Sequence, residues 1–264
     1  MGKSVAVITG ASSGLGAVFA RKLAAQHDLL LIARRQEKLD ALAAELTAQY
    51  GCAVSVLAAD LTEEKDLAAV AERIAGVENL ALLVNDAGFG ARGLFWESSL
   101  DVQEQMHRLH VMATVRLSHA ALRTMVAKNS GGIVNVASVA AFARRPRSVS
   151  YGATKTWMTA FTEGLYLELR SIRSAVKVQA LCPGFTYTEF HDTAHIDRKS
   201  MAPPSLWLQA EFVVDESLRA LTRGKLFVVP GWRYKAIIAL VSVLPNSVRL
   251  AVEAAGARKR PSGR

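Results

Sequence analysis

The stretch Val5-Ala-Val-Ile-Thr9-Gly10-Ala-Ser-Ser-Gly14-Leu-Gly16 decides the fold of this chain. Its first half is an apolar, β-branched run typical of a buried strand, and its second half is a glycine-rich turn. Residues 14–26 then have the apolar spacing of a helix. Glycines in such a turn let the backbone approach a pyrophosphate, and the helix amino terminus supplies free N–H groups. A tight turn without a ligand is the alternative.

The same alternation of short apolar runs and longer amphipathic stretches continues along the chain. Further strands are expected at 29–33, 54–58, 80–84, 133–137, 176–181 and 226–229, and helices at 36–49, 63–75, 99–128 and 151–170. The apolar runs are continuous, which is typical of parallel strands buried on both faces. The sequence therefore predicts an α/β fold, a doubly wound parallel sheet of about seven strands with helices on both faces.

No second core is visible, so we expect a single domain over residues 1–257. Within it, residues 189–212 interrupt the rhythm with two adjacent prolines and several large apolar side chains. A long irregular segment late in an α/β domain is usually functional, and we interpret this one as a substrate loop. Residues 232–257 form a C-terminal extension, and residues 258–264 form a basic tail that we expect to be flexible.

The composition narrows the class of protein. The 264 residues are 51% hydrophobic and carry a net charge of +9, with Cys52 and Cys182 as the two cysteines. Two distant cysteines without metal-ligand spacing favour a reduced, cytoplasmic protein with no metal site. The longest late apolar run, 236–244, is too short to span a bilayer but is compatible with a helix that lies over a pocket, at a dimer contact or on a membrane surface. No nucleic-acid motif accompanies the positive charge, so no nucleic-acid partner is expected.

A tyrosine and a lysine, Tyr151 and Lys155, stand four residues apart and share one face of the expected helix. A cation beside a phenol favours the phenolate and brings the tyrosine pKa towards a value useful for proton transfer. Ser138 follows the expected strand at 133–137, at the sheet edge where α/β proteins bind their ligands. Together these three side chains suggest chemistry between a carbonyl and an alcohol.

With these residues in place, the chain resembles the short-chain dehydrogenase/reductase family over residues 4–190. The glycine turn has the spacing Thr-Gly-x-x-x-Gly-x-Gly, and 85–88 resembles the family's Asn-Asn-Ala-Gly. Ser138, Tyr151 and Lys155 match its catalytic residues. The resemblance implies a Rossmann-like fold and cofactor contacts at the following positions: Gly10, Ser12, Ser13, Gly14, Leu15, Gly16, Asp60, Leu61, Asn85, Ala87, Gly88, Tyr151, Lys155, Pro183, Gly184, Thr186 and Thr188.

The residues after the second expected strand indicate which nicotinamide cofactor the chain prefers. An acidic residue there would bind a ribose 2′-hydroxyl, but Arg34 and Arg35 follow the strand instead. Guanidinium groups suit a phosphate in geometry and charge, and Ser12 and Ser13 supply hydroxyl donors. We therefore expect NADP(H) in preference to NAD(H). The alternative is that both arginines are ordinary surface charges.

The resemblance implies hydride transfer between the nicotinamide and a ketone, aldehyde or alcohol. Tyr151 would act as general acid or base, Lys155 would lower its pKa and bind the nicotinamide ribose, and Ser138 would orient the carbonyl oxygen. The chain departs from the family at His110, which stands where an asparagine usually supports a proton relay. This histidine either holds the relay water or simply packs beside the cofactor. Asp86, the second departure, is interpreted as a tolerated turn residue.

The sequence leaves several substrate classes open. Phe142, Phe185, Phe190, Met201 and Trp207 either line an apolar cleft for a lipophilic carbonyl compound or belong to the core. Arg144, Arg145 and Arg147 either attract an acyl-type anionic substrate or solvate a loop. The substrate classes that remain are 3-oxoacyl groups, steroids and small ketones. His191 and His195 are expected to be loop histidines rather than metal ligands.

Three functions follow from these features. The favoured one is an NADP(H)-dependent oxidoreductase acting on a small-molecule carbonyl or alcohol, as a homo-oligomer. The second is a protein that binds NADP(H) without turnover, as a sensor or scaffold. The third, a basic protein bound to nucleic acid or a membrane surface, predicts binding that weakens steeply with salt.

Overall fold

The computed structural model describes residues 3–91, 93–189, 202–245 and 247–251. Its main sheet is parallel and has seven strands in the order β3-β2-β1-β4-β5-β6-β9. The strands are β1 (Val5–Thr9), β2 (Asp28–Ala33), β3 (Val54–Ala58), β4 (Leu80–Asn85), β5 (Gly132–Val136), β6 (Lys177–Leu181) and β9 (Phe227–Val228). This confirms the predicted doubly wound sheet and its strand positions to within about two residues.

The order of the strands fixes where a ligand can bind. The chain runs outward from β1 to β3 and then crosses back to β4 on the other side of β1. Ile8 pairs with Val84 and Asn85 pairs with Asn135, so β1, β4 and β5 end along one edge. In parallel sheets this edge, at the point where the strand order reverses, is the usual ligand site.

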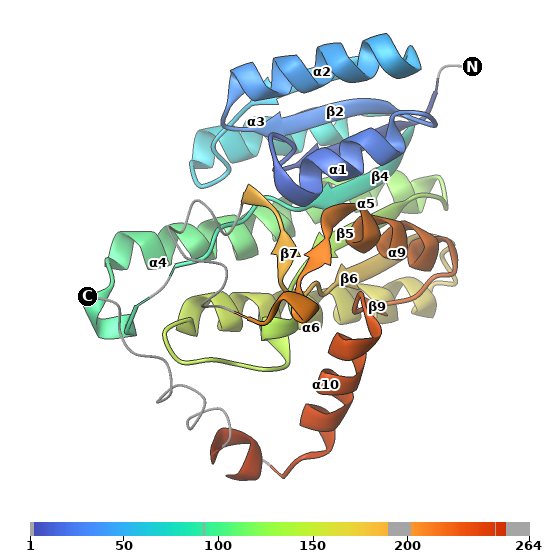
Figure 1. Cartoon of the computed structure of the whole chain (residues 1–264). Helices are drawn as coiled ribbons and strands as arrows, with labels where there is room; N and C mark the ends of the chain where they lie inside the picture. The colour runs from blue at the N-terminus through green and yellow to red at the C-terminus, as the bar shows by residue number, and fades with distance from the viewer. Residues whose placement is uncertain (1–2, 92, 190–201, 246, 252–264) are drawn as a thin grey trace.

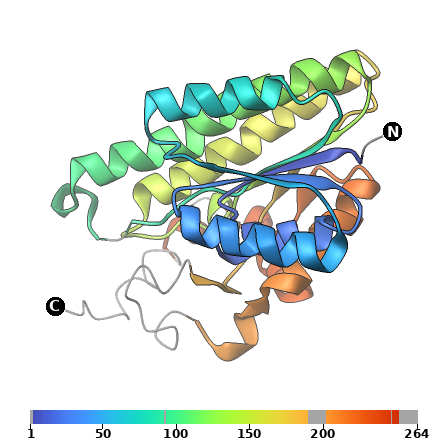
Figure 2. The same ribbon diagram turned by 90° about the horizontal axis from the view of Figure 1, so that it is seen from above.

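Helices cover both faces of the sheet, as Figures 1 and 2 show. On one face lie α1 (Gly14–Leu23), α2 (Gln36–Tyr50) and α9 (Ala210–Thr222). On the other lie α3 (Glu64–Ala75), α5 (Thr114–Ala127) and α6 (Val149–Ser171). The arrangement follows from right-handed crossovers between parallel strands.

The predicted helix over 99–128 contains a feature that the sequence did not reveal. It begins as α4 (Leu100–His107), widens into the π-helical segment η2 (Arg108–Ala113), and continues as α5. Apolar periodicity does not register one extra residue in a turn, whereas π turns often mark functional sites. His110 lies within this segment.

The segment after β6 has some regular structure. Two short strands, β7 (Thr186–Tyr187) and β8 (Leu208–Gln209), pair in parallel, and η4 (Pro204–Leu206) precedes β8. Because α9 begins at Ala210, the irregular segment ends earlier than the expected 212. Phe190, His191, His195, Met201 and the tail 258–264 lie outside the described residues.

The C-terminal extension contains α10 (Trp232–Val243), which projects from the body of the molecule in Figure 1. Among the described helices, none has the length and apolarity that a bilayer crossing requires.

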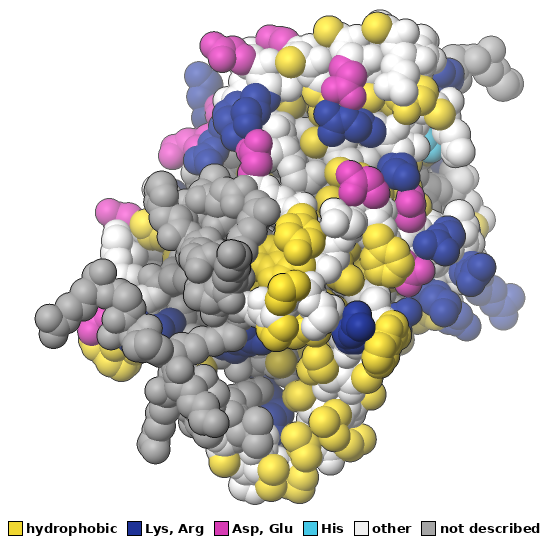
Figure 3. Space-filling model, in the orientation of Figure 1, with side chains coloured by type: hydrophobic (Ala, Val, Ile, Leu, Met, Phe, Trp, Pro, Cys, Tyr) yellow, Lys and Arg dark blue, Asp and Glu magenta, His cyan; other side chains and the backbone are white. Residues whose placement is uncertain are grey.

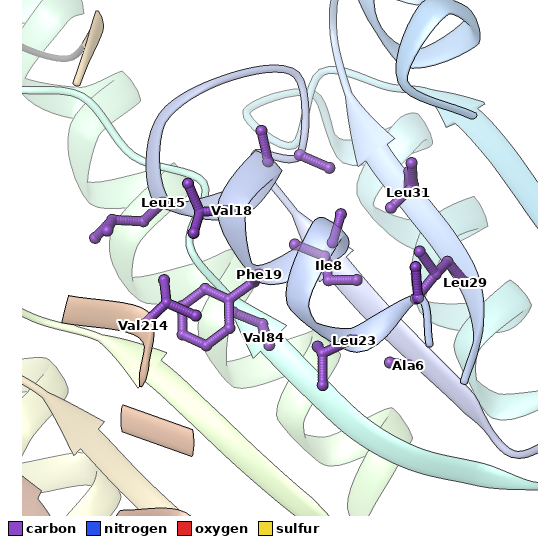
Figure 4. Packing of buried hydrophobic residues seen from close by; sticks show 14 of the residues in the cluster. Ala6, Ile8, Leu15, Val18, Phe19, Leu23, Leu29, Leu31, Val84 and Val214 are labelled. Carbon is purple, nitrogen blue, oxygen red and sulfur yellow. The ribbon is translucent and has the colours of Figure 1, made fainter. Parts of the chain in front are cut away.

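The core on the α1 face surrounds one aromatic side chain. Phe19 of α1 is fully buried and lies among Leu15, Val84 and Val214, as Figure 4 shows. Since α1 carries the glycine turn at its amino end, the packing of Phe19 against the sheet also holds that turn in place.

Replacing Phe19 with alanine should therefore destabilise the protein. The lost burial and the remaining cavity should cost about 3–5 kcal/mol in the free energy of unfolding, measured by urea denaturation. Phe95→Ala is the matched control, because Phe95 is 49% exposed and its replacement should change stability by about 0.5 kcal/mol or less. Equal effects of the two changes would contradict the assigned core.

Candidate active site

The glycine turn after β1 has the geometry of an anion cradle. Gly10 and Gly14 have φ angles of +70° and +58°, in the left-handed region that favours glycine. A Cβ at Gly16 would lie 2.5 Å from the Gly10 carbonyl oxygen, so only glycine fits there. Ser13 precedes α1 without a side-chain hydrogen bond that caps it. The amino terminus of α1 thus suits a phosphate group.

Ser138, Tyr151 and Lys155 meet at the carboxyl end of β5. Ser138 begins the short helix η3 (Val139–Ala141) and accepts a hydrogen bond from the Ala140 N–H at 3.1 Å. The Tyr151 hydroxyl is hydrogen-bonded to the Ser138 side chain. Lys155 Nζ lies 5.8 Å from the centre of the Tyr151 ring and donates to the Val136 carbonyl oxygen at 2.7 Å. The structure therefore brings together the three side chains that the sequence singled out.

The Tyr151 pKa is raised, whereas the sequence predicted that Lys155 would lower it. Burial raises the pKa of Tyr151, and its hydrogen bond with Ser138 opposes that rise only in part. Burial also lowers the pKa of Lys155 to about 8. The reason is the same for both groups, since a poorly solvated site disfavours the charged form of each.

Asp86 belongs to the site and is more than a turn residue. Its Oδ2 would lie 2.9 Å from a Cβ at Gly16 and 3.2 Å from one at Gly10, so the carboxyl group packs beneath the glycine turn. Burial raises its pKa to about 7, against the opposing charge of Lys155 and a hydrogen bond from the Gly16 backbone. The negative charge of Asp86 in turn helps to raise the pKa of Tyr151.

His110 is fully buried, and both of its ring nitrogens have protein partners. The Phe89 N–H donates to Nε2 at 3.3 Å, and Nδ1 lies 2.9 Å from the Thr154 hydroxyl. The Thr154 hydroxyl donates to the Tyr151 carbonyl oxygen at 3.1 Å. Nδ1 must then carry the proton of a neutral ring, and burial lowers the pKa of His110 well below its ordinary value.

Asn85 is held by a buried polar chain that sequence reasoning missed. Its amide donates to Asn135 Oδ1 at 2.8 Å and to the Ser118 hydroxyl at 3.2 Å. The Asn135 amide continues to the Thr162 hydroxyl at 2.9 Å. An asparagine inside the apolar run of β5 was the one available signal, because a buried amide requires partners.

The turn after β4, at residues 86–88, is also held in place by its contacts. The N–H groups of Asp86 and Ala87 both donate to the Thr9 hydroxyl, at 3.0 and 3.1 Å. A Cβ at Gly88 would lie 2.8 Å from His110 Nε2. Leu15 and Leu61 are buried and contribute packing beside the site.

Tyr234 of α10 holds the turn after β6 in place. Tyr234 packs against Gly184 so closely that a Cβ there would overlap its ring. Its hydroxyl accepts from the Phe185 N–H at 2.9 Å and donates to the Leu206 carbonyl oxygen at 2.7 Å. Thus α10 holds the turn that leads to β7.

The segment after β6 also contains Pro183, Thr186 and Thr188, which the resemblance predicts to contact the cofactor. The Val139 N–H donates to the Pro183 carbonyl oxygen at 3.0 Å. The Thr186 hydroxyl donates to the Gly184 carbonyl oxygen at 3.0 Å, and Thr188 lies over Gly14. Position 188 is therefore next to the amino terminus of α1.

Of the two arginines after β2, Arg35 contacts the glycine turn and Arg34 lies near Asp60. Arg35 donates to the hydroxyl oxygens of Ser12 and Ser13, at 3.0 and 2.8 Å from Nη2. Arg34 is largely exposed and lies 3.7 Å from an oxygen of Asp60. Asp60 also accepts from the N–H and hydroxyl of Thr62, which together with Arg34 outweigh its partial burial and lower its pKa.

Three aromatic side chains lie close together after β6. Trp207 is 5.4 Å from Phe185 and 5.1 Å from Tyr187, measured between ring centres. The Arg145 guanidinium lies 5.5 Å from the centre of the Phe185 ring. Trp207 is buried, Phe142 packs against a small core cluster, and apolar side chains are exposed along α10 (Figure 3).

Known proteins share both this sequence pattern and this fold. The family model for short chain dehydrogenases matches residues 4–199. The chain belongs to the short-chain dehydrogenase family. It is 32% identical to the very-long-chain 3-oxoacyl-CoA reductase of Anas platyrhynchos, over 92% of this chain and 76% of that protein.

Three solved structures of this short-chain dehydrogenase's relatives are similar along nearly the whole chain. The short-chain dehydrogenase of Sphingobium yanoikuyae, in complex with NADPH, is 36% identical with a TM-score of 0.82, covering 92% of this chain and 97% of that one. A bulky-bulky ketone specific alcohol dehydrogenase from Comamonas testosteroni is 30% identical with a TM-score of 0.78, covering 94% and 97%. A relative from Burkholderia phymatum, in complex with NAD, is 27% identical with a TM-score of 0.80, covering 95% of each chain.

The buried carboxyl of Asp86 should make the stability of this short-chain dehydrogenase depend on pH. Its pKa rises from 3.8 to about 7 on folding, so the folded state keeps a proton that the unfolded state releases. The stabilisation is full below the unfolded pKa and is lost as the pH rises through the folded pKa. Asp86→Asn should therefore gain stability relative to the natural protein between about pH 5 and pH 7.

Urea unfolding midpoints across this pH range measure the effect. Asp101→Asn, at an exposed position of α4, is the control and should shift the midpoints by the same small amount at every pH. A constant difference between Asp86→Asn and the natural protein across the range would contradict the assigned environment.

Proposed function

We propose that this short-chain dehydrogenase interconverts a ketone or aldehyde and an alcohol with NADP(H), using Tyr151 as general acid and base. The observation that carries the proposal is the Tyr151 hydroxyl bonded to Ser138, with Lys155 beside its ring. This group stands at the same sheet edge as the glycine turn. A proton donor next to a nucleotide cradle is what carbonyl reduction by hydride transfer requires.

The residues present fit a dinucleotide. The positive φ angles at Gly10 and Gly14 open the turn to a pyrophosphate, and α1 begins directly behind it. Thr188 lies over Gly14, where it would contact the same cofactor. When bound, the nicotinamide supplies or accepts the hydride.

Side chains of the protein would donate and accept the proton that accompanies hydride transfer. The raised pKa of Tyr151 keeps its phenol neutral at neutral pH, ready to donate to a carbonyl oxygen during reduction. Ser138 would hold that oxygen in place, and the Lys155 ammonium would stabilise the phenolate that remains. In the direction of alcohol oxidation Tyr151 must first lose its proton, so oxidation should rise with pH.

His110 acts in this proposal as a positioning residue. Its ring joins Phe89, at the end of the β4 loop, to Thr154 on α6. Thr154 lies directly before Lys155, and the His110 ring is 5.9 Å from the Tyr151 ring. The imidazole thus fixes the spacing between the cofactor loop and the catalytic helix, and neither nitrogen is left over for a relay water.

A preference for NADP(H) is supported by Arg34 and Arg35. Both follow β2, and Arg35 reaches Ser12 and Ser13 of the glycine turn. The two residues directly after β2 are these arginines rather than an acidic residue. The NADPH complex of the Sphingobium relative is consistent with this preference.

The substrate we propose is a lipophilic or acyl-type carbonyl compound. The aromatic group of Phe185, Tyr187 and Trp207 lies next to the turn after β6 and offers apolar contact. Two relatives are named for large substrates, a very-long-chain 3-oxoacyl-CoA and bulky-bulky ketones.

Tyr151→Phe should abolish turnover and leave cofactor binding almost intact. The change removes the proton donor while the ring and its packing remain, so kcat should fall by about a thousandfold or more. NADPH oxidation with a panel of ketones measures turnover, and fluorescence titration measures NADPH binding.

Tyr166→Phe is the matched control for that experiment. Tyr166 lies on the same helix, and its hydroxyl contacts only the exposed Arg170 side chain among the described hydrogen bonds. It should keep full activity. Activity retained in Tyr151→Phe would refute the assigned role, and NADPH binding without turnover of any ketone by the natural protein would favour a sensor.

The natural protein should bind NADPH more tightly than NADH, by about tenfold, because a charge-assisted contact to phosphate is worth about 1.5–3 kcal/mol. Arg34→Ala combined with Arg35→Ala should reduce that ratio towards one. Arg21→Ala is the control, since Arg21 forms an ion pair with Glu45. Equal affinities of the natural protein for NADPH and NADH would refute the preference.

A further inference from the structure

Glu189 lies near the C-terminal end of residues 4–199, which the family model matches. Its carboxylate forms ion pairs with cations beside the glycine turn. Glu189 lies two residues after β7 and accepts from Arg35 Nη1 at 3.1 Å. Its two oxygens also accept from Lys38 Nζ, at 2.9 and 3.2 Å. Glu189 thus bridges two cations that lie more than 150 residues earlier in the chain.

Two other nitrogens of the Arg35 side chain contact the glycine turn. Its Nε and Nη2 contact the Ser12 hydroxyl oxygen at 3.2 and 3.0 Å, and Nη2 also contacts that of Ser13. Nη1 is the donor that faces Glu189. A ligand phosphate that approaches Arg35 from this side therefore meets a carboxylate first.

The bridge stands at a hollow large enough for part of a nucleotide. A cavity of about 480 Å³ is lined by Ser12, Ser13 and Gly14, and by Lys38 and Glu189. The hydrogen bonds from Lys38 and Arg35 hold the pKa of the Glu189 carboxyl below its ordinary value. Glu189 is therefore an anion at neutral pH, in the position where the predicted ligand is also an anion.

We propose that Glu189 sets the cofactor selectivity of this protein, by competing with a ribose 2′-phosphate for Arg35 and Lys38. The inference rests on the proposed use of NADP(H). A 2′-hydroxyl carries no charge and leaves the bridge in place, whereas a 2′-phosphate must displace the carboxylate or lie beside it. Glu189 therefore lowers the affinity for NADPH and spares that for NADH.

The size of the effect of Glu189 on NADPH affinity depends on how exposed the three charged side chains are. The side chains of Arg35, Lys38 and Glu189 are 43%, 46% and 45% exposed, so the bridge is weak enough to open. A phosphate carries about −1.5 to −2 charges and replaces a single carboxylate, so it wins the competition at a reduced affinity. The selectivity for NADPH is thus present but incomplete.

Glu189→Gln tests this, because it removes the charge and keeps the shape. The probes are 2′,5′-ADP and 5′-AMP, which differ only in the 2′-phosphate, and isothermal titration calorimetry measures their Kd. The variant should bind 2′,5′-ADP about fivefold more tightly, a size typical of exposed ion pairs. Its Kd for 5′-AMP should stay within about twofold.

Glu45→Gln is the matched control. Glu45 lines the same cavity, is 42% exposed and also forms an ion pair, but its partner is Arg21. The ratio of the two Kd values should be unchanged in this variant. In addition, Glu189→Gln should lose its effect when Arg35→Ala and Lys38→Ala are already present, because the contested cations are gone.

Three outcomes would overturn the inference. Unchanged Kd values for both probes would show that Glu189 does not compete, and weaker binding of 2′,5′-ADP would show that it positions Arg35 for the phosphate. An equal shift for both probes would show a general effect on the nucleotide site. The ratio of NADPH to NADH affinity in the natural protein tests the proposed preference separately, so either idea can fail without the other.

Discussion

The hydroxyl of Thr9 joins the two loops on which the candidate site depends. It accepts the N–H groups of Asp86 and Ala87 and donates to the Val84 carbonyl oxygen at 3.3 Å. Strand β1 thereby holds the turn after β4 beside its own glycine turn, at the point where the strand order reverses. A single buried hydroxyl therefore holds the two turns together, because each of these backbone groups needs a partner once it is out of water.

Poor solvation gives the same site its chemical character. It raises the pKa of Tyr151 and Asp86 and lowers that of Lys155 and His110, so each group is pushed towards its neutral form. At the exposed rim the arrangement differs, since Glu189 forms ion pairs with Arg35 and Lys38.

Much of the fold could be predicted because its signals are local. Continuous apolar runs marked the buried strands, and the motif residues Ser138, Tyr151 and Lys155 came together as expected. The π-helical segment at His110 and the short β7–β8 pair escaped prediction. A single inserted residue hardly alters apolar periodicity, and two-residue strands carry no periodic signal at all.

The sequence by itself determined the family, the parallel sheet and the positions of the candidate catalytic side chains, since these follow from strand patterns and motif spacing. Only the tertiary structure decided how those side chains are charged and paired. Asp86 became a buried acid beneath the glycine turn, His110 became a link between two loops, and Glu189 met Arg35 across the fold. Burial and long-range ion pairing depend on segments far apart in the chain, which no local pattern encodes.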